Sequence, residues 1–188
     1  MRRNAFVDYG IIAVVAIALA LVIQGFVVKP YRIPSPSMND TLLPGDRVLV
    51  NRLMYHFRDP QHGDIVVFTW PVNRKYVFIK RIIGVPGDTI SLKAGRVYVN
   101  GEQISEPYVR QVNGVAVPTQ PAPATAGTTM SQPWSLQQPY EVPAGEYFVM
   151  GDNRTESDDS RDWGPVPRRA ILGEAVVTFW PLGHLRLL

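Results

Sequence analysis

Hydrophobic positions along the chain fall into two kinds of pattern. From Tyr9 to Val28 no residue is charged and only Gln24 is strongly polar, which predicts a helix of roughly 30 Å, long enough to cross a bilayer once. After this segment the apolar residues come in short runs separated by Gly, Pro and Asp, which is typical of strands and turns. Strands are expected over residues 46–50, 64–70, 76–83, 89–92, 97–99, 146–150 and 175–180.

Two features outside the strands complete the predicted architecture. Asn100-Gly101 stands between two short apolar runs and predicts a tight hairpin, because both residues tolerate positive φ. Residues from about 111 to 140 carry no charge and are rich in Pro, Ala, Thr, Gln and Ser, which predicts a flexible insertion. The predicted organisation is a flank at 1–8, a single transmembrane helix at 9–28, and a mainly β, antiparallel domain at 29–188 with a small hairpin and insertion subdomain.

Composition narrows the possible functions. The chain has 188 residues and a net charge of +3, and its basic residues are scattered, so nucleic acid is not expected as a partner. With no cysteine it has no disulfide, thiolate metal site or cysteine nucleophile. The positive start Met1-Arg2-Arg3 is also compatible with a cleaved signal peptide, but the apolar run is longer than usual and no small-x-small pattern follows it. Flanking charges weakly favour a topology with the domain outside the cytoplasm.

Lys80 is the candidate with the clearest chemistry. It lies inside the apolar run Tyr76–Gly84, and burial lowers the pKa of a lysine toward the neutral form, which is a general base. The matching nucleophile is a serine of the turn Ile33-Pro-Ser-Pro-Ser-Met38, since a serine and a lysine suffice for acyl transfer. Taken singly, a lysine that extends to solvent and an ordinary turn serine are the simpler interpretations.

Several motifs, in order, resemble the bacterial type I signal peptidases, the serine-lysine leader peptidases. They are Pro34-Ser-Pro-Ser-Met38 with Thr41–Asp46, Gly63–Phe68, Ile79-Lys-Arg81 with Gly84–Asp88, and Gly151-Asp-Asn-Arg154 with Ser157, Asp159, Ser160 and Arg161.

The resemblance implies a catalytic mechanism and a role for each matching residue. Ser37 would be the nucleophile and Lys80 the general base, while the Ser37 N–H and the Ser35 hydroxyl would form the oxyanion hole. Ser157 would orient the lysine. Asp152 with Arg81, and Asp159 with Arg161, would support the site. The residues expected to line pockets for small substrate side chains are Ile33, Met38, Leu42, Phe78 and Ile79.

The same resemblance implies the setting of the enzyme. Its substrates would be signal-peptide-bearing preproteins cut after Ala-x-Ala-type sites, with no cofactor or metal. It would act at the outer face of the cytoplasmic membrane, in contact with the lipid bilayer and near the protein translocation machinery. The C-terminal residues Trp180 to Leu188 are expected to form either a buried strand or an apolar face that enters lipid.

The chain also departs from the family pattern. Asp40 replaces a proline that usually follows the nucleophile motif, and Thr155-Glu156 replace an Asp-Asn pair before Ser157. Neither change affects Ser37 or Lys80.

Other functions are less well supported by the sequence. A histidine triad would need His56, His62 or His184, none of which lies in a motif. The acidic segment 152–159 lacks the glycine and oxygen-ligand spacing of a calcium loop. A self-cleaving repressor-type protease would carry a helical DNA-binding domain in place of the apolar segment. The remaining alternative is an inactive membrane-anchored β domain that binds exported polypeptides.

Overall fold

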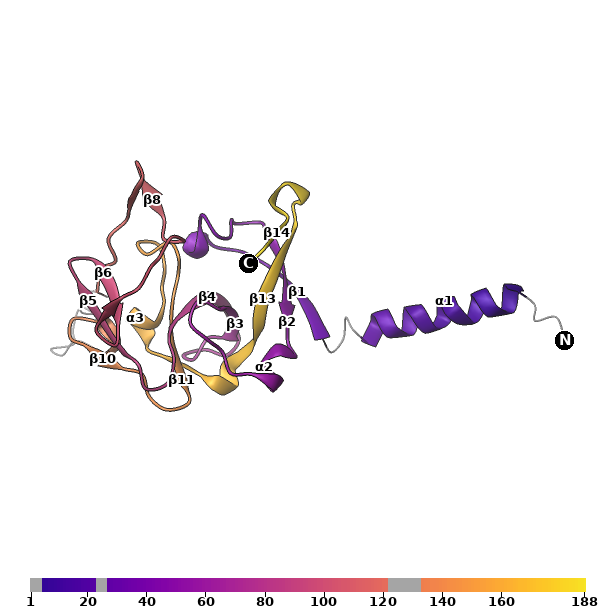
Figure 1. The fold of residues 1–188 in the computed structure, drawn as a ribbon, viewed down its shortest axis with the longest axis horizontal. Coiled ribbons are helices and arrows are strands. Elements are labelled where there is room, and N and C mark those ends of the chain that lie inside the picture. Colours follow the sequence, from indigo (N-terminus) through magenta and orange to yellow (C-terminus); the bar gives the residue numbers. More distant parts are fainter. Residues whose placement is uncertain (1–4, 23–26, 122–132) are drawn as a thin grey trace.

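The short apolar runs fold into antiparallel β-sheets (Figure 1). The structure is a computed structural model and describes residues 5–22, 27–121 and 133–188. The helices are α1 (Ala5–Val22), α2 (Met54–Phe57) and α3 (Ser160–Trp163). The strands are β1 (Val28–Arg32), β2 (Arg47–Asn51), β3 (Ile65–Thr69), β4 (Val77–Gly84), β5 (Thr89–Lys93), β6 (Arg96–Val99), β7 (Glu102–Gln103), β8 (Gln111–Val112), β9 (Val115–Ala116), β10 (Tyr140–Glu141), β11 (Glu146–Met150), β12 (Val166–Pro167), β13 (Ile171–Trp180) and β14 (Arg186–Leu187).

The main sheet has the strand order β1-β2-β13-β3-β4-β11-β12, and β14 also pairs with β13. Its central strands β3 and β4 are mostly apolar on both faces, with Lys80 and Arg81 as the charged exceptions, and most of their residues are buried. One core cluster includes Val48, Val50 and Ile79, and the other includes Val66, Phe68 and Ile82. This arrangement confirms the predicted mainly β, antiparallel class.

A smaller sheet, β10-β5-β6-β7, packs through its own core cluster around Ile90, Val97 and Phe148. The predicted tight turn is present between β6 and β7, where Asn100 and Gly101 both have positive φ. Gly84, at the end of β4, allows this sheet to approach the main sheet, since a Cβ there would lie only 2.6 Å from Ile90 Cδ1.

The N-terminal segment differs from the sequence prediction. The helix α1 spans Ala5–Val22, so it includes Asp8 and begins inside the predicted flank. The predicted span ends at Val28, but Val28 is the first residue of β1. It pairs with Asn51 of β2 and therefore belongs to the sheet. Residues 23–26 lie outside the described residues. Within the described part of the chain, no helix is long and apolar enough to cross a membrane.

The segment predicted as a flexible insertion is partly packed against the domain. Thr119, Ser135 and Leu136 are buried, and the Trp134 indole N–H donates to the Asp162 carbonyl at 3.4 Å. The composition of the segment does not reveal these contacts, because they involve only Thr119 and the short stretch from Trp134 to Leu136. Residues 122–132 of the predicted insertion lie outside the described residues.

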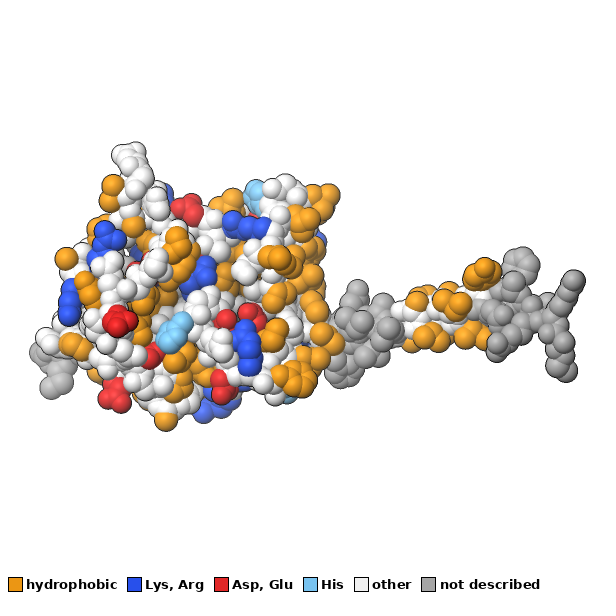
Figure 2. All heavy atoms as spheres, in the orientation of Figure 1, with side chains coloured by type: hydrophobic (Ala, Val, Ile, Leu, Met, Phe, Trp, Pro, Cys, Tyr) orange, Lys and Arg blue, Asp and Glu red, His pale blue; other side chains and the backbone are white. Residues whose placement is uncertain are grey.

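The C-terminal residues do not form a buried strand. Trp180, Leu182, Leu185 and Leu187 are 49%, 71%, 63% and 83% exposed. β14 pairs with β13 over only two residue pairs, so it adds backbone hydrogen bonds without covering the side chains. Figure 2 shows apolar side chains gathered on the side of the β domain that faces α1.

Candidate active site

Ser37 lies in a short 3-10 turn, Pro36–Met38, between β1 and β2. Ser35 precedes the turn in an extended conformation, and Pro36 starts it with a fixed φ. The side chain of Ser37 is buried at 5% exposure. Its hydroxyl lies 3.3 Å from the Ser35 hydroxyl. Asp40, two residues after the turn, has φ +74. Proline cannot adopt this φ, so the proline usual in the family would not fit this backbone conformation.

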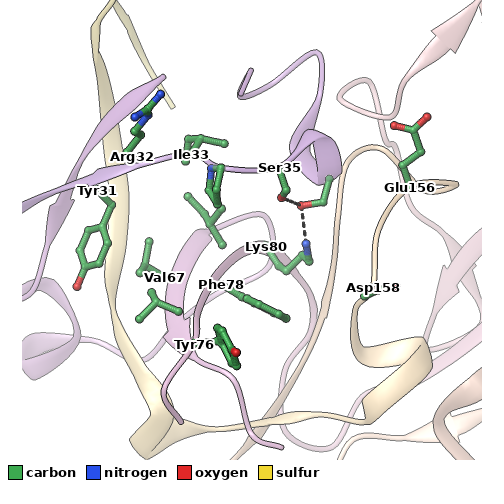
Figure 3. A pocket seen from close by; sticks show the side chains of 14 residues that line it. Tyr31, Arg32, Ile33, Ser35, Val67, Tyr76, Phe78, Lys80, Glu156 and Asp158 are labelled. Atoms are coloured by element: carbon green, nitrogen blue, oxygen red, sulfur yellow. Dashed lines mark hydrogen bonds between the residues drawn. The ribbon is translucent and has the colours of Figure 1, made fainter. Parts of the chain in front are cut away.

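Lys80 lies in the middle of β4, where it pairs with Val66 of β3. β4 is flanked by β3 on one side and β11 on the other. The Lys80 side chain is only 4% exposed, yet its Nζ donates a hydrogen bond of 2.6 Å to Ser37 Oγ. Figure 3 shows this contact among the side chains that line a cavity.

Burial is the main influence on the pKa of Lys80. The pKa of Lys80 is lowered from 10.5 to about 8, mainly by desolvation and to a lesser extent by the positive charge of Arg161. The negative charges of Asp159, Asp158 and Asp152 act in the opposite direction. A substantial neutral fraction is therefore present near pH 8, whereas an exposed lysine is almost wholly charged there.

The cavity beside the two residues has a volume of about 320 Å³. On one side of Ser37 its walls are mainly apolar, with Ile33, Val67 and Phe78 (Figure 3). On the other side of the Ser37–Lys80 contact lie Glu156 and Asp158. An apolar pocket next to a serine hydroxyl is suited to a short, uncharged side chain.

The loop that follows β11 holds the serine turn in place. Asn153 N–H donates to the Ser37 carbonyl at 3.1 Å, and the Asn153 side-chain amide donates to the Pro36 carbonyl at 3.1 Å. The neighbouring Asp152 is completely buried and accepts two hydrogen bonds from Arg81, at 2.9 and 2.7 Å, and one from the Thr41 hydroxyl at 2.5 Å. The loop therefore joins the serine turn to the strand that carries Lys80.

Asp159 organises the second half of this loop. It is completely buried and accepts hydrogen bonds from Arg161, from the Gly151 N–H at 3.0 Å and from the Ser157 hydroxyl at 2.8 Å. Burial alone would raise the pKa of Asp159, but the charge and hydrogen bonds of Arg161 lower it overall. Gly151 has no room for a side chain, because a Cβ would collide with the Ser157 hydroxyl and the Ser37 carbonyl.

The sequence matches the family model for "Signal peptidase, peptidase S26" over residues 6–180. The chain belongs to the signal peptidase family. Probable signal peptidase I-2 of Synechocystis sp. is 40% identical over 99% of this chain and 78% of its own length. Signal peptidase I of Leptolyngbya laminosa is 40% identical over 90% and 77%, and that of Pseudomonas aeruginosa is 36% identical over 96% and 75%.

These relatives agree on the type of enzyme. They carry the name signal peptidase I at 36–40% identity over most of their length, so the chain is a signal peptidase I hydrolase. The signal peptidase family acts on signal peptides, and this result confirms the activity class predicted from the sequence motifs. The relatives do not by themselves assign a role to Ser37 or Lys80 in this chain.

The structure brings most of the predicted site residues of this signal peptidase together. Ser35, Ser37 and Lys80 line the cavity, as do Ile33, Phe78 and Ile79. Met38 and Leu42 do not line it, because both are completely buried in the core under β1 and β2. Ser157 contacts Asp159, and within the described residues no hydrogen bond joins it to Lys80.

Other contacts of the site were not assigned from the sequence. Thr41 and Asn153 stood inside recognised motifs, but their partners are more than a hundred residues away. Arg154 is buried and donates to Thr119 at 2.7 Å and to Glu106 at 2.5 Å. The histidines make different contacts: His62 pairs with Asp88 and His184 with Asp46, and neither lines the cavity.

Proposed function

We propose that the protein is a serine endopeptidase that removes signal peptides with a Ser37–Lys80 dyad. The observation that carries this proposal is the 2.6 Å contact between Lys80 Nζ and Ser37 Oγ, made by a lysine that is 4% exposed. A buried lysine next to a serine hydroxyl is costly to the fold, so a catalytic role accounts for it better than a structural one.

Neutral Lys80 begins the reaction by accepting the Ser37 proton while Ser37 Oγ attacks the scissile carbonyl carbon. The tetrahedral oxyanion is stabilised by the Ser37 N–H and by the Ser35 hydroxyl, which lies 3.3 Å from Ser37 Oγ. The C–N bond then breaks, and protonated Lys80 gives its proton to the leaving amine.

Hydrolysis of the acyl-enzyme uses the same base. Lys80, neutral again, accepts a proton from water as the water oxygen attacks the ester carbon. The ester bond breaks, Ser37 regains a proton from Lys80, and the new carboxyl group leaves. Ser157 acts indirectly in this scheme: it binds Asp159, whose charge in turn raises the pKa of Lys80.

We further propose that the apolar cavity wall selects small side chains one and three residues before the cut. Ile33, Phe78 and Ile79 narrow the cavity, and a narrow apolar pocket excludes large side chains more strongly than it attracts small ones. Met38 and Leu42 do not line the cavity, but they would support this wall because they pack in the same core cluster as Ile33 and Ile79.

The proposed setting is the outer face of the cytoplasmic membrane, near the protein translocation machinery. The apolar segment that precedes β1 would attach the domain to the bilayer, and the exposed Trp180, Leu182, Leu185 and Leu187 would contact it. Retention of the full chain in membranes after alkaline carbonate extraction, and digestion of its domain by protease added outside spheroplasts, would support this topology. Release by carbonate would contradict it.

The experiment that tests the dyad is cleavage of a secretory precursor with an Ala-x-Ala site by the detergent-solubilised chain. We expect Ser37→Ala and Lys80→Ala to abolish cleavage and the wild-type rate to rise with pH around a midpoint near 8. His62→Ala, which is remote from the cavity, should retain activity. Loss of activity in that variant, with cleavage retained in Lys80→Ala, would contradict the dyad. No cleavage by folded wild type would favour the inactive binding domain.

A further inference from the structure

A second cavity, of about 550 Å³, shares no lining residue with the active-site cavity. It lies between α2, the end of β2 and the start of β13. Four of its lining residues can carry positive charge, namely Arg52, His56, Arg168 and Arg169, and no carboxylate lines it. The remaining walls are mostly apolar, with Leu53, Ile171 and Leu172 among them.

The positive charge of this cavity is only partly neutralised by neighbouring carboxylates. Asp64 and Glu174 both bind Arg58, at 2.7 and 2.8 Å. Arg58 does not line the cavity, so these two carboxylates are already paired with a cation outside it. Asp59 lies 3.5 Å from Arg168 Nε, but that nitrogen has no hydrogen-bond partner within the described residues. Within the same residues, no hydrogen bond or ion pair involves the guanidinium groups of Arg52 and Arg169, which are both exposed.

The cavity lies where the chain enters the β domain from its N-terminal segment. The backbone N–H of Arg52 donates to the Val27 carbonyl at 2.8 Å, and Val28 starts β1 opposite Asn51. Figure 1 shows α2 on the side of the domain from which α1 extends. Phe57, the last residue of α2, is 85% exposed beside this site.

We propose that this cavity binds the phosphate-bearing headgroup of an anionic lipid. Guanidinium groups match phosphate oxygens in geometry and charge, and can bind them through two parallel hydrogen bonds. An acyl chain could leave the headgroup along apolar side chains, namely Leu53 and Leu172 of the cavity wall and the exposed Phe57. A free phosphate would use the arginines alone, so the apolar walls favour the lipid. Arginines next to an anionic membrane surface each strengthen its binding.

This site is independent of the Ser37–Lys80 mechanism, and its test uses no cleavage measurement. The full chain in a neutral detergent is titrated with short-chain phosphatidylglycerol, phosphatidylcholine of the same chain length, or sodium phosphate at constant ionic strength. Binding is followed by the rise in the melting temperature and by native mass spectrometry of retained lipid.

Three variants define the expected result. Arg52→Gln with Arg169→Gln should bind phosphatidylglycerol roughly thirtyfold more weakly than wild type. Arg52→Lys with Arg169→Lys keeps the charge and should stay within roughly threefold of wild type. The matched control Arg74→Gln with Lys75→Gln removes the same charge from an exposed turn and should bind like wild type.

Three outcomes would overturn the proposal. Equal binding by wild type and the Arg52/Arg169 glutamine variant would place the lipid elsewhere. If the Arg74/Lys75 control variant binds phosphatidylglycerol as weakly as the Arg52/Arg169 glutamine variant, only the net charge of the protein matters. If sodium phosphate stabilises wild type as much as phosphatidylglycerol does, and the arginine variant loses both effects, the cavity is a site for free phosphate.

Discussion

At the scale of the residue, the two protonation states of Lys80 differ strongly in their effect on folding. The pKa of Lys80 is about 8 in the folded protein and 10.5 when the side chain is free in water. The unfolded chain therefore binds this proton more tightly, and protonated Lys80 destabilises the fold. The destabilisation is complete below about pH 8 and disappears as the pH rises toward 10.5. Its full size is on the order of 3 kcal/mol.

Replacing this lysine should therefore stabilise the protein while removing its activity. We expect Lys80→Met to raise the melting temperature at pH 7, because an apolar side chain of similar length replaces a buried charge. The difference from wild type should shrink between pH 8 and pH 10.5. Thermal unfolding of both proteins across this range provides the measurement, and a less stable variant at pH 7 would contradict the assignment of burial as the dominant effect.

Asp158 offers a second way to adjust the same lysine. Its charge raises the pKa of Lys80, and its side chain lines the cavity. Asp158→Asn should lower the pKa of Lys80 and move the midpoint of the pH-rate profile to lower pH. Glu156→Gln removes another carboxylate of the same cavity, one that is not among the main influences on the pKa of Lys80. An equal shift of the midpoint in both variants would mean that only overall charge matters.

At the scale of the element, the loop from residue 151 to residue 159 determines where the serine turn lies relative to β4. Its backbone and side chains bind the Ser37 and Pro36 carbonyls, Arg81 of β4 and the Thr41 hydroxyl. These contacts are at least partly buried, so the groups depend on their partners to replace lost water. The distance between Ser37 Oγ and Lys80 Nζ thus depends on a loop that contributes neither of these two side chains.

The pair Asp152–Arg81 should be the most important of these contacts for stability. The two side chains are 0% and 11% exposed, so Asp152→Asn leaves a poorly solvated guanidinium without its counter-charge. We expect a loss of about 3 kcal/mol in the free energy of unfolding. Glu156→Gln breaks the exposed, 3.7 Å pair with Arg110 and should cost less than about 1 kcal/mol. Chemical denaturation of both variants makes the comparison, and similar losses would refute it.

Gly151 provides a steric test of the same loop. Because a Cβ there would collide with the Ser37 carbonyl and the Ser157 hydroxyl, Gly151→Ala should displace the serine turn from Lys80. We expect at least a tenfold fall in kcat with a smaller change in KM, since an ångström of misplacement is costly to the chemical step. Gly183→Ala, where nothing lies within 4 Å of the added carbon, should match wild type. A fully active Gly151→Ala enzyme would show that the turn does not need this fixed position.

At the scale of the whole molecule, the order of strands in the sheet assembles the site. β1 leads into the serine turn at one edge, β4 carries the lysine at the centre, and β11 leads into the supporting loop. One cavity thereby brings together Ser37, Lys80, which is 43 positions further along the chain, and Asp158, which is 121 positions further along. The exposed C-terminal residues lie on β13 and beyond it, beside β2.

The exposed C-terminal residues predict a contact between the β domain and lipid. Leu182 and Leu187 are exposed and make an apolar surface that lipid would cover. The double variant Leu182→Glu with Leu187→Glu should cleave a vesicle-bound precursor several-fold more slowly than wild type while cleaving a soluble peptide at the same rate. Val112→Glu with Val115→Glu alters two exposed apolar residues of β8 and β9 and is the matched control. Equal slowing in both variants would argue against a dedicated surface.

The sequence by itself determined the class of fold, the family and the candidate chemistry. Strand periodicity and turn residues are local properties, so the antiparallel class and the Asn100-Gly101 hairpin could be predicted from them. The ordered motifs, read as a resemblance, were enough to select Ser37 and Lys80 from the other serines and lysines. The apolar run around Lys80 already indicated burial, and hence a lowered pKa.

Only the tertiary structure decided which side chains meet. Met38 and Leu42 are core residues and not pocket residues, because the direction of a side chain in a turn depends on the turn's position on the sheet. Ser157 contacts Asp159 rather than Lys80 for the same reason. The contacts of Thr41, Asn153 and Arg154 join distant segments and leave no periodic signal. Val28, predicted as the end of the apolar span, belongs to the sheet because it pairs with Asn51 of β2. Hydrophobicity alone does not show which partner a residue will have.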